Sequence, residues 1–314
     1  MPALPARPLG DSGLEASVVG LGCNQFGRPL DLSGTQAVLD AALADGVTFL
    51  DTANSYGGGR SEQFIGEWLP SRRDRVVLAT KFGSPNAPDD YQGPRGSADY
   101  IPRAVEASLR RLQTDTIDLY WYHRPDGVTP IAETLEALDA LVRAGTVRAI
   151  GASNFTAGQI EEADRVARER GLTRFCAIQN EYSLLAREAE ADVLPLCERL
   201  GIAFIPYYPL ASGLLTGKYR RDAPAPAGAR LAGRGTIATD AQWGVIEALT
   251  GYAQGRGLTV AQVAIGALLS RPAVSSVIAG ATKPEQVGAN AAAAAWAPSE
   301  ADLAELDELL AGRP

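Results

Sequence analysis

The sequence predicts an α/β fold, a closed (β/α)8 TIM barrel formed by a single domain that spans residues 1–314. Short apolar runs, often rich in β-branched residues, recur about every 30 residues, and most are followed by a helical pattern. This alternation is typical of a parallel sheet. Eight strand–helix units at this spacing favour a closed barrel over a doubly wound sheet, which usually has fewer strands and a glycine-rich first turn.

The expected elements follow in order along the chain. The strands are 18–21, 48–51, 76–80, 117–122, 147–152, 175–179, 202–207 and 276–280. The helices that follow them include 35–44, 101–112, 131–144, 156–170 and 189–200. Residues 8–14 are typical of an N-terminal hairpin with a glycine-containing turn, and residues 301–311 of an extra C-terminal helix. Both would be accessory to the barrel.

Two intervals between strands are longer than the rest. Their additional residues, around 83–97 and 211–234, are rich in glycine, proline and polar side chains. Each segment begins just past the carboxyl end of a strand, where TIM barrels place their active sites. We therefore expect two rim loops that contact a cofactor or substrate.

The charged residues and the histidine exclude several classes of function. Acidic residues outnumber basic ones by 37 to 29, which argues against a nucleic-acid partner. The only histidine, His123, excludes a metal site built from several histidines, so we expect no metal and no metal-dependent hydrolase. Only Lys81, Lys218 and Lys283 are lysines among many arginines, and such a lysine can mark a site that needs a compact amine.

The cysteines and the apolar segments predict where the protein works. Cys23, Cys176 and Cys197 are widely spaced, which fits a reducing compartment. No apolar stretch approaches the roughly 18 residues of a membrane helix, and the first residues lack the apolar core of a signal peptide. We expect a cytoplasmic protein with a small-molecule partner and no membrane or nucleic-acid partner, with a monomer favoured over an oligomer.

Titratable side chains end three consecutive predicted strands. Asp51 closes the second strand, Lys81 the third and His123 the fourth. Tyr56 follows Asp51 by five residues, in a loop whose glycines let the backbone fold back over the barrel mouth. We expect these four side chains to converge on one rim.

Together the four groups have the chemistry to protonate a carbonyl oxygen or to deprotonate an alcohol. A tyrosine is a poor acid near neutral pH unless a cation stabilises its phenolate, and Lys81 can supply that cation. Asp51 would keep the lysine charged in a desolvated site. A neutral His123 could donate a hydrogen bond to the carbonyl oxygen and orient it toward Tyr56.

With these residues identified, the sequence resembles the aldo-keto reductase family. The shared motifs cover nearly the whole chain: Gly20-Leu-Gly22, Phe49-Leu-Asp-Thr-Ala53, Tyr56-Gly57, Thr80-Lys81, Ile117-Asp-Leu-Tyr120, His123-Arg-Pro-Asp126, Ile150-Gly-Ala-Ser-Asn154, Gln179-Asn180, Pro209-Leu210, Gly213-Leu-Leu-Thr-Gly-Lys218 and Gly280-Ala-Thr-Lys283-Pro-Glu-Gln286. The resemblance implies the same barrel and a catalytic tetrad of Asp51, Tyr56, Lys81 and His123, with Tyr56 as the proton donor. It implies hydride transfer from NADPH, or alternatively NADH, to an aldehyde or ketone.

The resemblance also implies where the cofactor binds. Ser153, Asn154 and Gln179 would hold the nicotinamide carboxamide, and the ring of Tyr207 would stack on the nicotinamide. Residues 210–218 would offer backbone N–H groups and Lys218 to the pyrophosphate. Lys283, at the start of a helix, would contact the 2′-phosphate. The full implied set is Gly22, Asn24, Asp51, Ser153, Asn154, Gln179, Tyr207, Pro209, Leu210, Ser212, Gly213, Leu215, Lys218, Gly280, Thr282, Lys283, Gln286 and Asn290.

The chain departs from the family pattern at a few positions. Tyr208 stands where a small serine is common, which changes the contacts expected beside the nicotinamide and the phosphates. For the substrate we expect a pocket lined by Phe26, Phe82, Trp121 and the loop after Lys81, suited to bulky or aromatic carbonyl compounds. The alternative hypothesis is an NADPH-binding, redox-sensing interaction module with little turnover.

Overall fold

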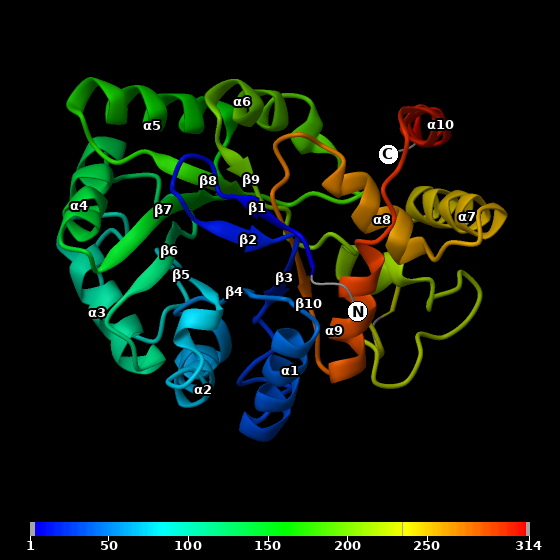
Figure 1. Cartoon of the computed structure of the whole chain (residues 1–314), viewed down its shortest axis with the longest axis horizontal. Coiled ribbons are helices and arrows are strands. Elements are labelled where there is room, and N and C mark those ends of the chain that lie inside the picture. Colours follow the sequence, from blue (N-terminus) through cyan, green and yellow to red (C-terminus); the bar gives the residue numbers. More distant parts are fainter. Residues whose placement is uncertain (1–3, 234, 312–314) are drawn as a thin grey trace.

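Eight parallel strands form the centre of the molecule in a computed structural model that describes residues 4–233 and 235–311 (Figure 1). Their order is β10-β3-β4-β5-β6-β7-β8-β9. The strands are β3 (Val19–Gly22), β4 (Phe49–Asp51), β5 (Val77–Phe82), β6 (Ile117–Tyr122), β7 (Val147–Ser153), β8 (Phe175–Gln179), β9 (Ala203–Phe204) and β10 (Val277–Gly280). Two parallel bridges, Phe204 with Val274 and Tyr207 with Ile278, join the two edges of the sheet. The predicted barrel is confirmed.

Helices surround this sheet and follow its strands in turn (Figure 1). They are α1 (Leu32–Ala44), α2 (Arg60–Trp68), α3 (Tyr100–Leu112), α4 (Ile131–Arg143), α5 (Ala157–Arg170), α6 (Val193–Leu200), α8 (Val260–Leu269) and α9 (Pro284–Ala293). Short 3-10 helices are η1 (Tyr56–Gly59), η2 (Arg73–Arg75), η3 (Glu188–Glu190) and η4 (Ala211–Thr216). None of the helices among the described residues is long and apolar enough to cross a membrane.

Two helices lie outside the strand–helix alternation. They are α7 (Asp240–Gly255) and α10 (Glu300–Leu310), and their buried side chains form one apolar cluster with those of α8. The C-terminal extra helix was predicted from its pattern, whereas α7 was not. The long interval between β9 and β10 therefore contains two helices as well as a rim loop.

A hairpin closes the amino end of the barrel. Its strands β1 (Ala6–Pro8) and β2 (Glu15–Ser17) are antiparallel, as expected from the sequence. Leu9 and Leu14 of this hairpin are buried in one cluster with barrel residues such as Phe49 and Leu119. Gly10 has φ +57, and a Cβ there would lie 2.5 Å from the carbonyl oxygen of Cys176, so the turn needs glycine.

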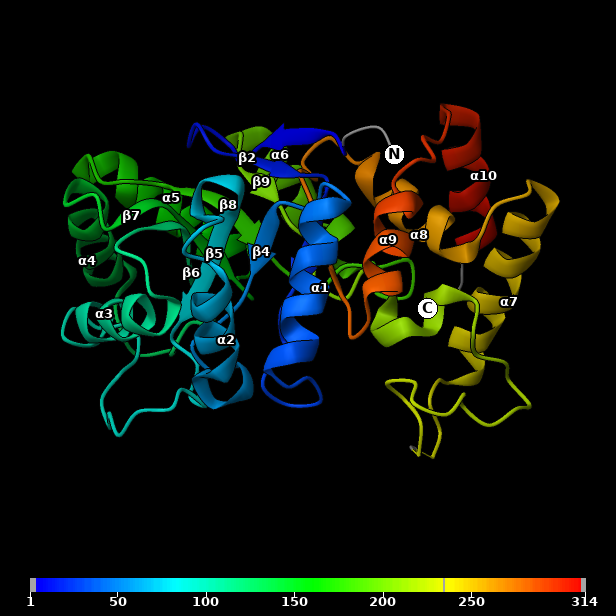
Figure 2. The ribbon, with the colours of Figure 1, turned by 60° about the horizontal axis from the view of Figure 1, so that its bottom comes forward.

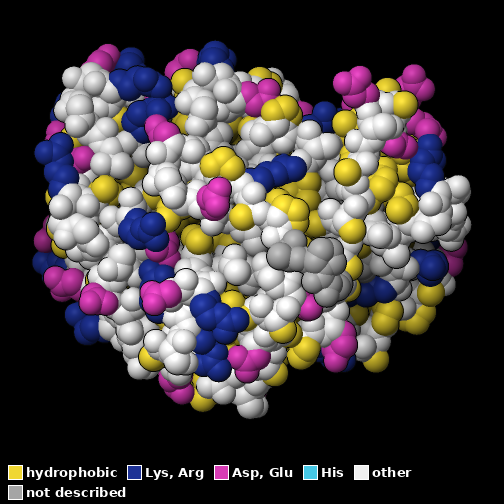
Figure 3. All heavy atoms as spheres, in the orientation of Figure 1, with side chains coloured by type: hydrophobic (Ala, Val, Ile, Leu, Met, Phe, Trp, Pro, Cys, Tyr) yellow, Lys and Arg dark blue, Asp and Glu magenta, His cyan; other side chains and the backbone are white. Residues whose placement is uncertain are grey.

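The hairpin and the two long loops lie at opposite ends of the molecule. In Figure 2 the hairpin is at the top, and the cyan loop after β5 and the yellow-green loop after η4 are at the bottom. With the amino end closed, the open rim is the carboxyl end of the strands. Over the face seen in Figure 3, acidic and basic side chains are interspersed, in keeping with surface ion pairs such as Arg187–Asp307, 2.6 Å apart.

The seventh strand is shorter than its apolar run suggests. The run 202–207 predicts a strand along its whole length, but β9 contains only Ala203 and Phe204. The backbone stays close to β8, since Ile205 N donates to Ile178 O over 2.8 Å. Pro206 has no N–H to donate, so the ladder is interrupted there.

Candidate active site

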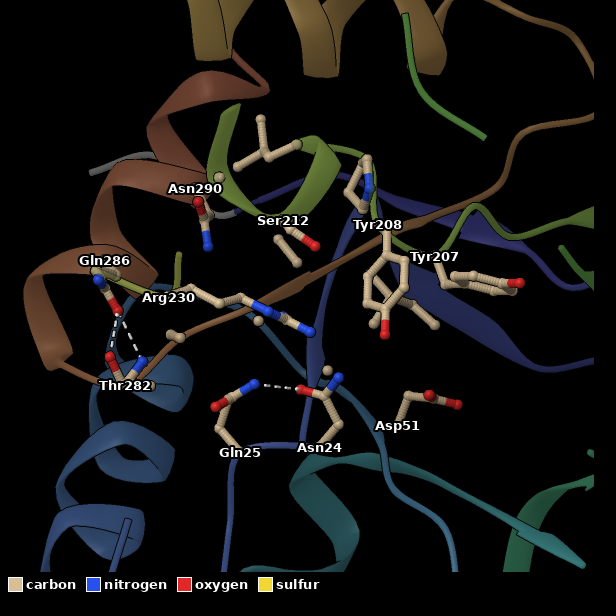
Figure 4. A pocket seen from close by; sticks show the side chains of 18 of the residues that line it. Asn24, Gln25, Asp51, Tyr207, Tyr208, Ser212, Arg230, Thr282, Gln286 and Asn290 are labelled. Atoms are coloured by element: carbon tan, nitrogen blue, oxygen red, sulfur yellow. Dashed lines mark hydrogen bonds between the residues drawn. The ribbon is translucent and has the colours of Figure 1, made fainter. Parts of the chain in front are cut away.

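A cavity of about 910 Å³ opens at the carboxyl rim of the barrel. Asp51, Tyr56 and His123 of the expected tetrad line it. Every residue of the implied cofactor set except Leu215 also lines it. Figure 4 shows part of this wall, from Asp51 at one end to Gln286 and Asn290 at the other. Parallel strands that end at one rim thus bring together residues that are far apart in the sequence.

Lys81 and Asp51 form a buried ion pair beneath Tyr56. The Lys81 side chain is fully buried, and its ammonium donates to Asp51 Oδ2 and, over 2.8 Å, to the carbonyl oxygen of Thr52. Gln179 Nε2 donates to the other Asp51 oxygen over 3.1 Å. The Lys81 nitrogen lies 5.1 Å from the centroid of the Tyr56 ring. Both carboxylate oxygens are satisfied and the cation faces the phenol.

Glycines place Tyr56 over this pair. Gly57, Gly58 and Gly59 all have positive φ, between 59° and 88°. A Cβ on Gly57 would lie 2.6 Å from the carbonyl oxygen of Phe26, so this backbone approach also requires glycine. The Tyr56 ring meets the ring of His123 edge to face, with centroids 5.9 Å apart. The phenol and the imidazole therefore face a common space.

The protonation states of these groups follow from burial and from neighbouring charge. Burial raises the pKa of Tyr56, although Lys81 opposes the shift, so the phenol keeps its proton at neutral pH. Burial and the charges of Lys81 and Arg124 lower the pKa of His123 to about 3, so the imidazole is neutral. Burial alone would lower the pKa of Lys81, but Asp51 and Tyr56 outweigh it and the pKa is raised. The expected effect of Lys81 is present, since its charge lowers the pKa of Tyr56, but burial acts in the opposite direction and is the larger cause.

The first turn of α2 contacts β4 and β5, the strands that carry Asp51 and Lys81. Ser61 Oγ lies 2.8 Å from Thr52 Oγ1 and donates to the carbonyl oxygen of Cys23 over 3.0 Å. Glu62 is fully buried. Its carboxylate accepts hydrogen bonds from Thr80 Oγ1 over 2.5 Å and from Arg111 Nε over 2.7 Å. Thr52 and Thr80 are the chain neighbours of Asp51 and Lys81. The helix thus fixes the loop of Tyr56 against the ends of β4 and β5.

An amide cluster adjoins the tetrad. Asn154 has a positive φ of 62°, and its Nδ2 donates to the carbonyl oxygen of His123 over 2.9 Å. Its backbone N–H donates to Asn180 Oδ1 over 2.7 Å. The Tyr207 hydroxyl donates to Asn154 Oδ1 over 2.8 Å. Asn154 therefore connects the end of β7 to His123, the end of β8 and the ring of Tyr207.

Three cations from the segments after β9 and β10 line the cavity. The structure gives Lys218, Arg230 and Lys283 no ion pair within the described part of the chain. Arg230 extends across the cavity, and its guanidinium lies 5.1 Å from the ring centroid of Tyr208 (Figure 4). Lys283 caps α9, with Pro284 at the first helical position. This part of the wall is therefore suited to anionic groups.

Comparison with known sequences agrees with this geometry. A sequence model described as the aldo/keto reductase family matches residues 18–311. The chain belongs to the aldo-keto reductase family. Like other members, this aldo-keto reductase is an oxidoreductase of a family that generally binds NAD(P)H.

Three relatives illustrate the range of names in the family. An "Uncharacterized oxidoreductase YrpG" of Bacillus subtilis is 38% identical, over 89% of this chain and 87% of the relative. A "Probable voltage-gated potassium channel subunit beta" of Arabidopsis thaliana is 36% identical, over 90% and 89%. A "Probable aldo-keto reductase 1" of Glycine max is 33% identical, over 96% and 87%.

The expected substrate-lining residues are not on the wall of this aldo-keto reductase's cavity. Phe26, Phe82 and Trp121 are each fully buried, and none of them lines this cavity. Side chains alternate along a strand, so Phe82 points away from Lys81 and packs between Tyr120 and Tyr122 outside the barrel.

Two more expected residues, Trp121 and Leu215, and the expected loop 83–97 also lie away from the cavity wall. Trp121 belongs to the buried cluster inside the barrel. Leu215 is buried in the cluster under α7 and α8. No residue of the loop 83–97 lines the cavity; within this loop Arg95 pairs with Asp89 over 2.8 Å, and Arg95 also donates to the Tyr100 hydroxyl of α3 over 2.6 Å.

Several lining residues of this aldo-keto reductase were not predicted from the sequence. They include Gln25, Arg124, Glu181 and Arg230. Arg124 and Glu181 each lie two residues after the end of a predicted strand, which was a usable signal. Arg230 lies deep in a long loop, where no periodicity predicts its position. Tyr208, noted as a departure, also lines the cavity with a positive φ of 55° and 38% of its surface exposed.

Proposed function

We propose that this aldo-keto reductase reduces an aldehyde or ketone to an alcohol, with NADPH as the hydride source and Tyr56 as the proton donor. The observation that carries the proposal is the buried Lys81–Asp51 pair beneath a protonated Tyr56, with the neutral His123 facing the same space. This set can deliver a proton to a carbonyl oxygen and stabilise the phenolate that remains.

The cavity fits a nicotinamide dinucleotide in chemistry and order. Amide and hydroxyl groups of Ser153, Asn154 and Gln179 adjoin the tetrad and can pair with a carboxamide. Lys218, Arg230 and Lys283, from the segments after β9 and β10, can pair with phosphates. Within the described chain, the buried Nδ1 of His123 has no hydrogen-bond partner, which is consistent with a polar ligand at this point.

In this proposal the protein positions and protonates the substrate. Bound NADPH supplies the hydride that the carbonyl carbon receives. The neutral imidazole of His123 donates a hydrogen bond to the carbonyl oxygen and holds it near the Tyr56 hydroxyl. Tyr56 transfers its proton to that oxygen, and the Lys81 ammonium, kept charged by Asp51, stabilises the phenolate.

A panel of aldehydes and ketones assayed with NADPH and with NADH tests the proposal. We expect oxidation of NADPH that depends on a carbonyl substrate, and weaker use of NADH. An absence of turnover with every aldehyde, by a protein that still binds NADPH, would contradict the proposed reaction.

Binding of NADPH without turnover of any aldehyde would favour an NADPH-binding, redox-sensing interaction module. The observation in its favour is the match to two plant proteins named as probable voltage-gated potassium channel β subunits, at 36% and 37% identity. Such a module would bind the dinucleotide in the same cavity and report its redox state to a partner. The module and the reductase differ in turnover, which the same panel measures.

A further inference from the structure

Arg124 is an unpaired cation beside the proposed catalytic residues. It directly follows His123 at the end of β6, lines the cavity and is solvent-exposed. Across residues 4–233 and 235–311 the structure gives it no ion pair and no hydrogen bond, whereas many arginines of the chain hold a carboxylate. Arg95, Arg111 and Arg174 are examples.

The position of Arg124 separates it from the cations proposed to bind the cofactor phosphates. In the ring of eight strands, β6 lies opposite β10. Lys283 follows β10 and Lys218 follows β9, whereas Arg230 lies farther along the loop after β9, with its guanidinium beside Tyr208. Phosphates held by Lys283 and Lys218 would therefore lie at the other side of the rim, which leaves Arg124 free for a different anion.

The other charges near Arg124 leave its positive charge uncompensated. Asp51 is neutralised by Lys81. Glu181, the other carboxylate on the wall, follows β8 and makes no ion pair with Arg124. The Arg124 charge also contributes to the lowered pKa of His123. An anionic group on the His123 side of the cavity would therefore be attracted by Arg124.

We propose that Arg124 binds a carboxylate of the substrate, so that the preferred substrates are aldehydes or ketones with a carboxylate remote from the carbonyl. A guanidinium accepts a carboxylate with two parallel hydrogen bonds, which would orient the substrate as well as bind it. The inference rests on the proposed reduction and adds the substrate class to it.

The test compares two substrates of nearly the same shape, 4-formylbenzoic acid and its methyl ester. We expect kcat/KM of the unmodified protein to favour the acid over the ester, and Arg124→Met to lose about ten- to hundredfold on the acid alone, the range for hydrogen bonds to charged groups. The loss should fall mainly in KM and shrink at high salt. Activity on the ester shows that the variant is folded.

Arg75→Met is the matched control. Arg75 is exposed, has no ion pair among the described residues and precedes β5 at the other end of the barrel. It should leave both substrates unchanged. Equal kcat/KM for acid and ester in the unmodified protein, or an equal loss on both in Arg124→Met, would overturn the inference while leaving the proposed reduction intact. No turnover of either substrate would instead contradict the proposed reduction.

Discussion

Lys81 and Asp51 are joined by a hydrogen-bonded ion pair that is almost fully excluded from water. Desolvating two charges is costly, and the pair persists because the Thr52 carbonyl and the Gln179 amide satisfy the remaining donor and acceptor sites. The cation is thereby fixed 5.1 Å from the Tyr56 ring centroid.

Removing the cation should affect both turnover and stability. Lys81→Met leaves Asp51 buried without its counter-ion, so we expect a loss of about 3–5 kcal/mol in the free energy of unfolding, measured with denaturant. We expect kcat to fall by about 10²-fold or more, because the Tyr56 phenolate loses its stabilising charge. Arg103→Met breaks the exposed pair with Asp99 and serves as the control, with a cost below about 1 kcal/mol. Similar effects from the two variants would contradict the role given to the buried pair.

The loop of Tyr56 allows a test with two adjacent glycines. A Cβ on Gly57 would clash with the Phe26 carbonyl oxygen, whereas a Cβ on Gly58 would meet no atom within 4 Å. Both residues have positive φ, so Ala at either position costs about 1 kcal/mol or more in backbone strain. Only Gly57→Ala should also displace Tyr56 and lower kcat severalfold. Steady-state kinetics and denaturation of both variants check this, and an equal kcat for the two would refute the close-approach argument.

His123 makes stability depend on pH. Its pKa is about 3 in the folded protein and about 6.5 in the unfolded chain. Below pH 6.5 the unfolded chain takes up a proton that the folded protein does not, so His123 reduces the unfolding free energy progressively down to about pH 3. The slope from this one group is at most about 1.4 kcal/mol per pH unit.

Unfolding experiments at pH 7 and pH 4.5 test this linkage. His123→Asn should lose less stability than the unmodified protein over this interval, since asparagine does not titrate. If the unfolding free energy of both proteins falls by the same amount between pH 7 and pH 4.5, the fold does not hold the imidazole neutral. The acidic residues contribute equally to both proteins and cancel in the comparison.

Lys283 should distinguish the two dinucleotides. If it contacts the 2′-phosphate, Lys283→Ala should weaken NADPH binding by about ten- to hundredfold and change NADH binding little. Lys218→Ala is the companion variant and should weaken both, because the pyrophosphate is common to both. Fluorescence titration of each dinucleotide gives the dissociation constants. An equal loss of both affinities in Lys283→Ala would exclude the 2′-phosphate contact.

Much of the barrel and of the tetrad's placement follows from the sequence, for a simple geometric reason. Strands that alternate with helices in one sheet are parallel and end at one rim, so Asp51, Lys81 and His123 are expected to meet there. The sequence-based prediction did not take into account the direction in which side chains next to a strand end point. Phe82 follows Lys81 by one residue and therefore points the opposite way. Arg230 lies in a loop whose path depends on tertiary contacts such as the one with Tyr208, which no local pattern encodes.

In the proposed reaction the Tyr56 phenol donates the proton to the carbonyl oxygen. Tyr56→Phe removes only the hydroxyl and leaves the Lys81–Asp51 pair and the cofactor cavity intact. Its kcat for reduction of an aldehyde, measured beside its affinity for NADPH, tests the claim most directly. We predict a loss of about 10²- to 10⁴-fold in kcat with NADPH affinity unchanged. Turnover within about tenfold of the unmodified protein would contradict the account.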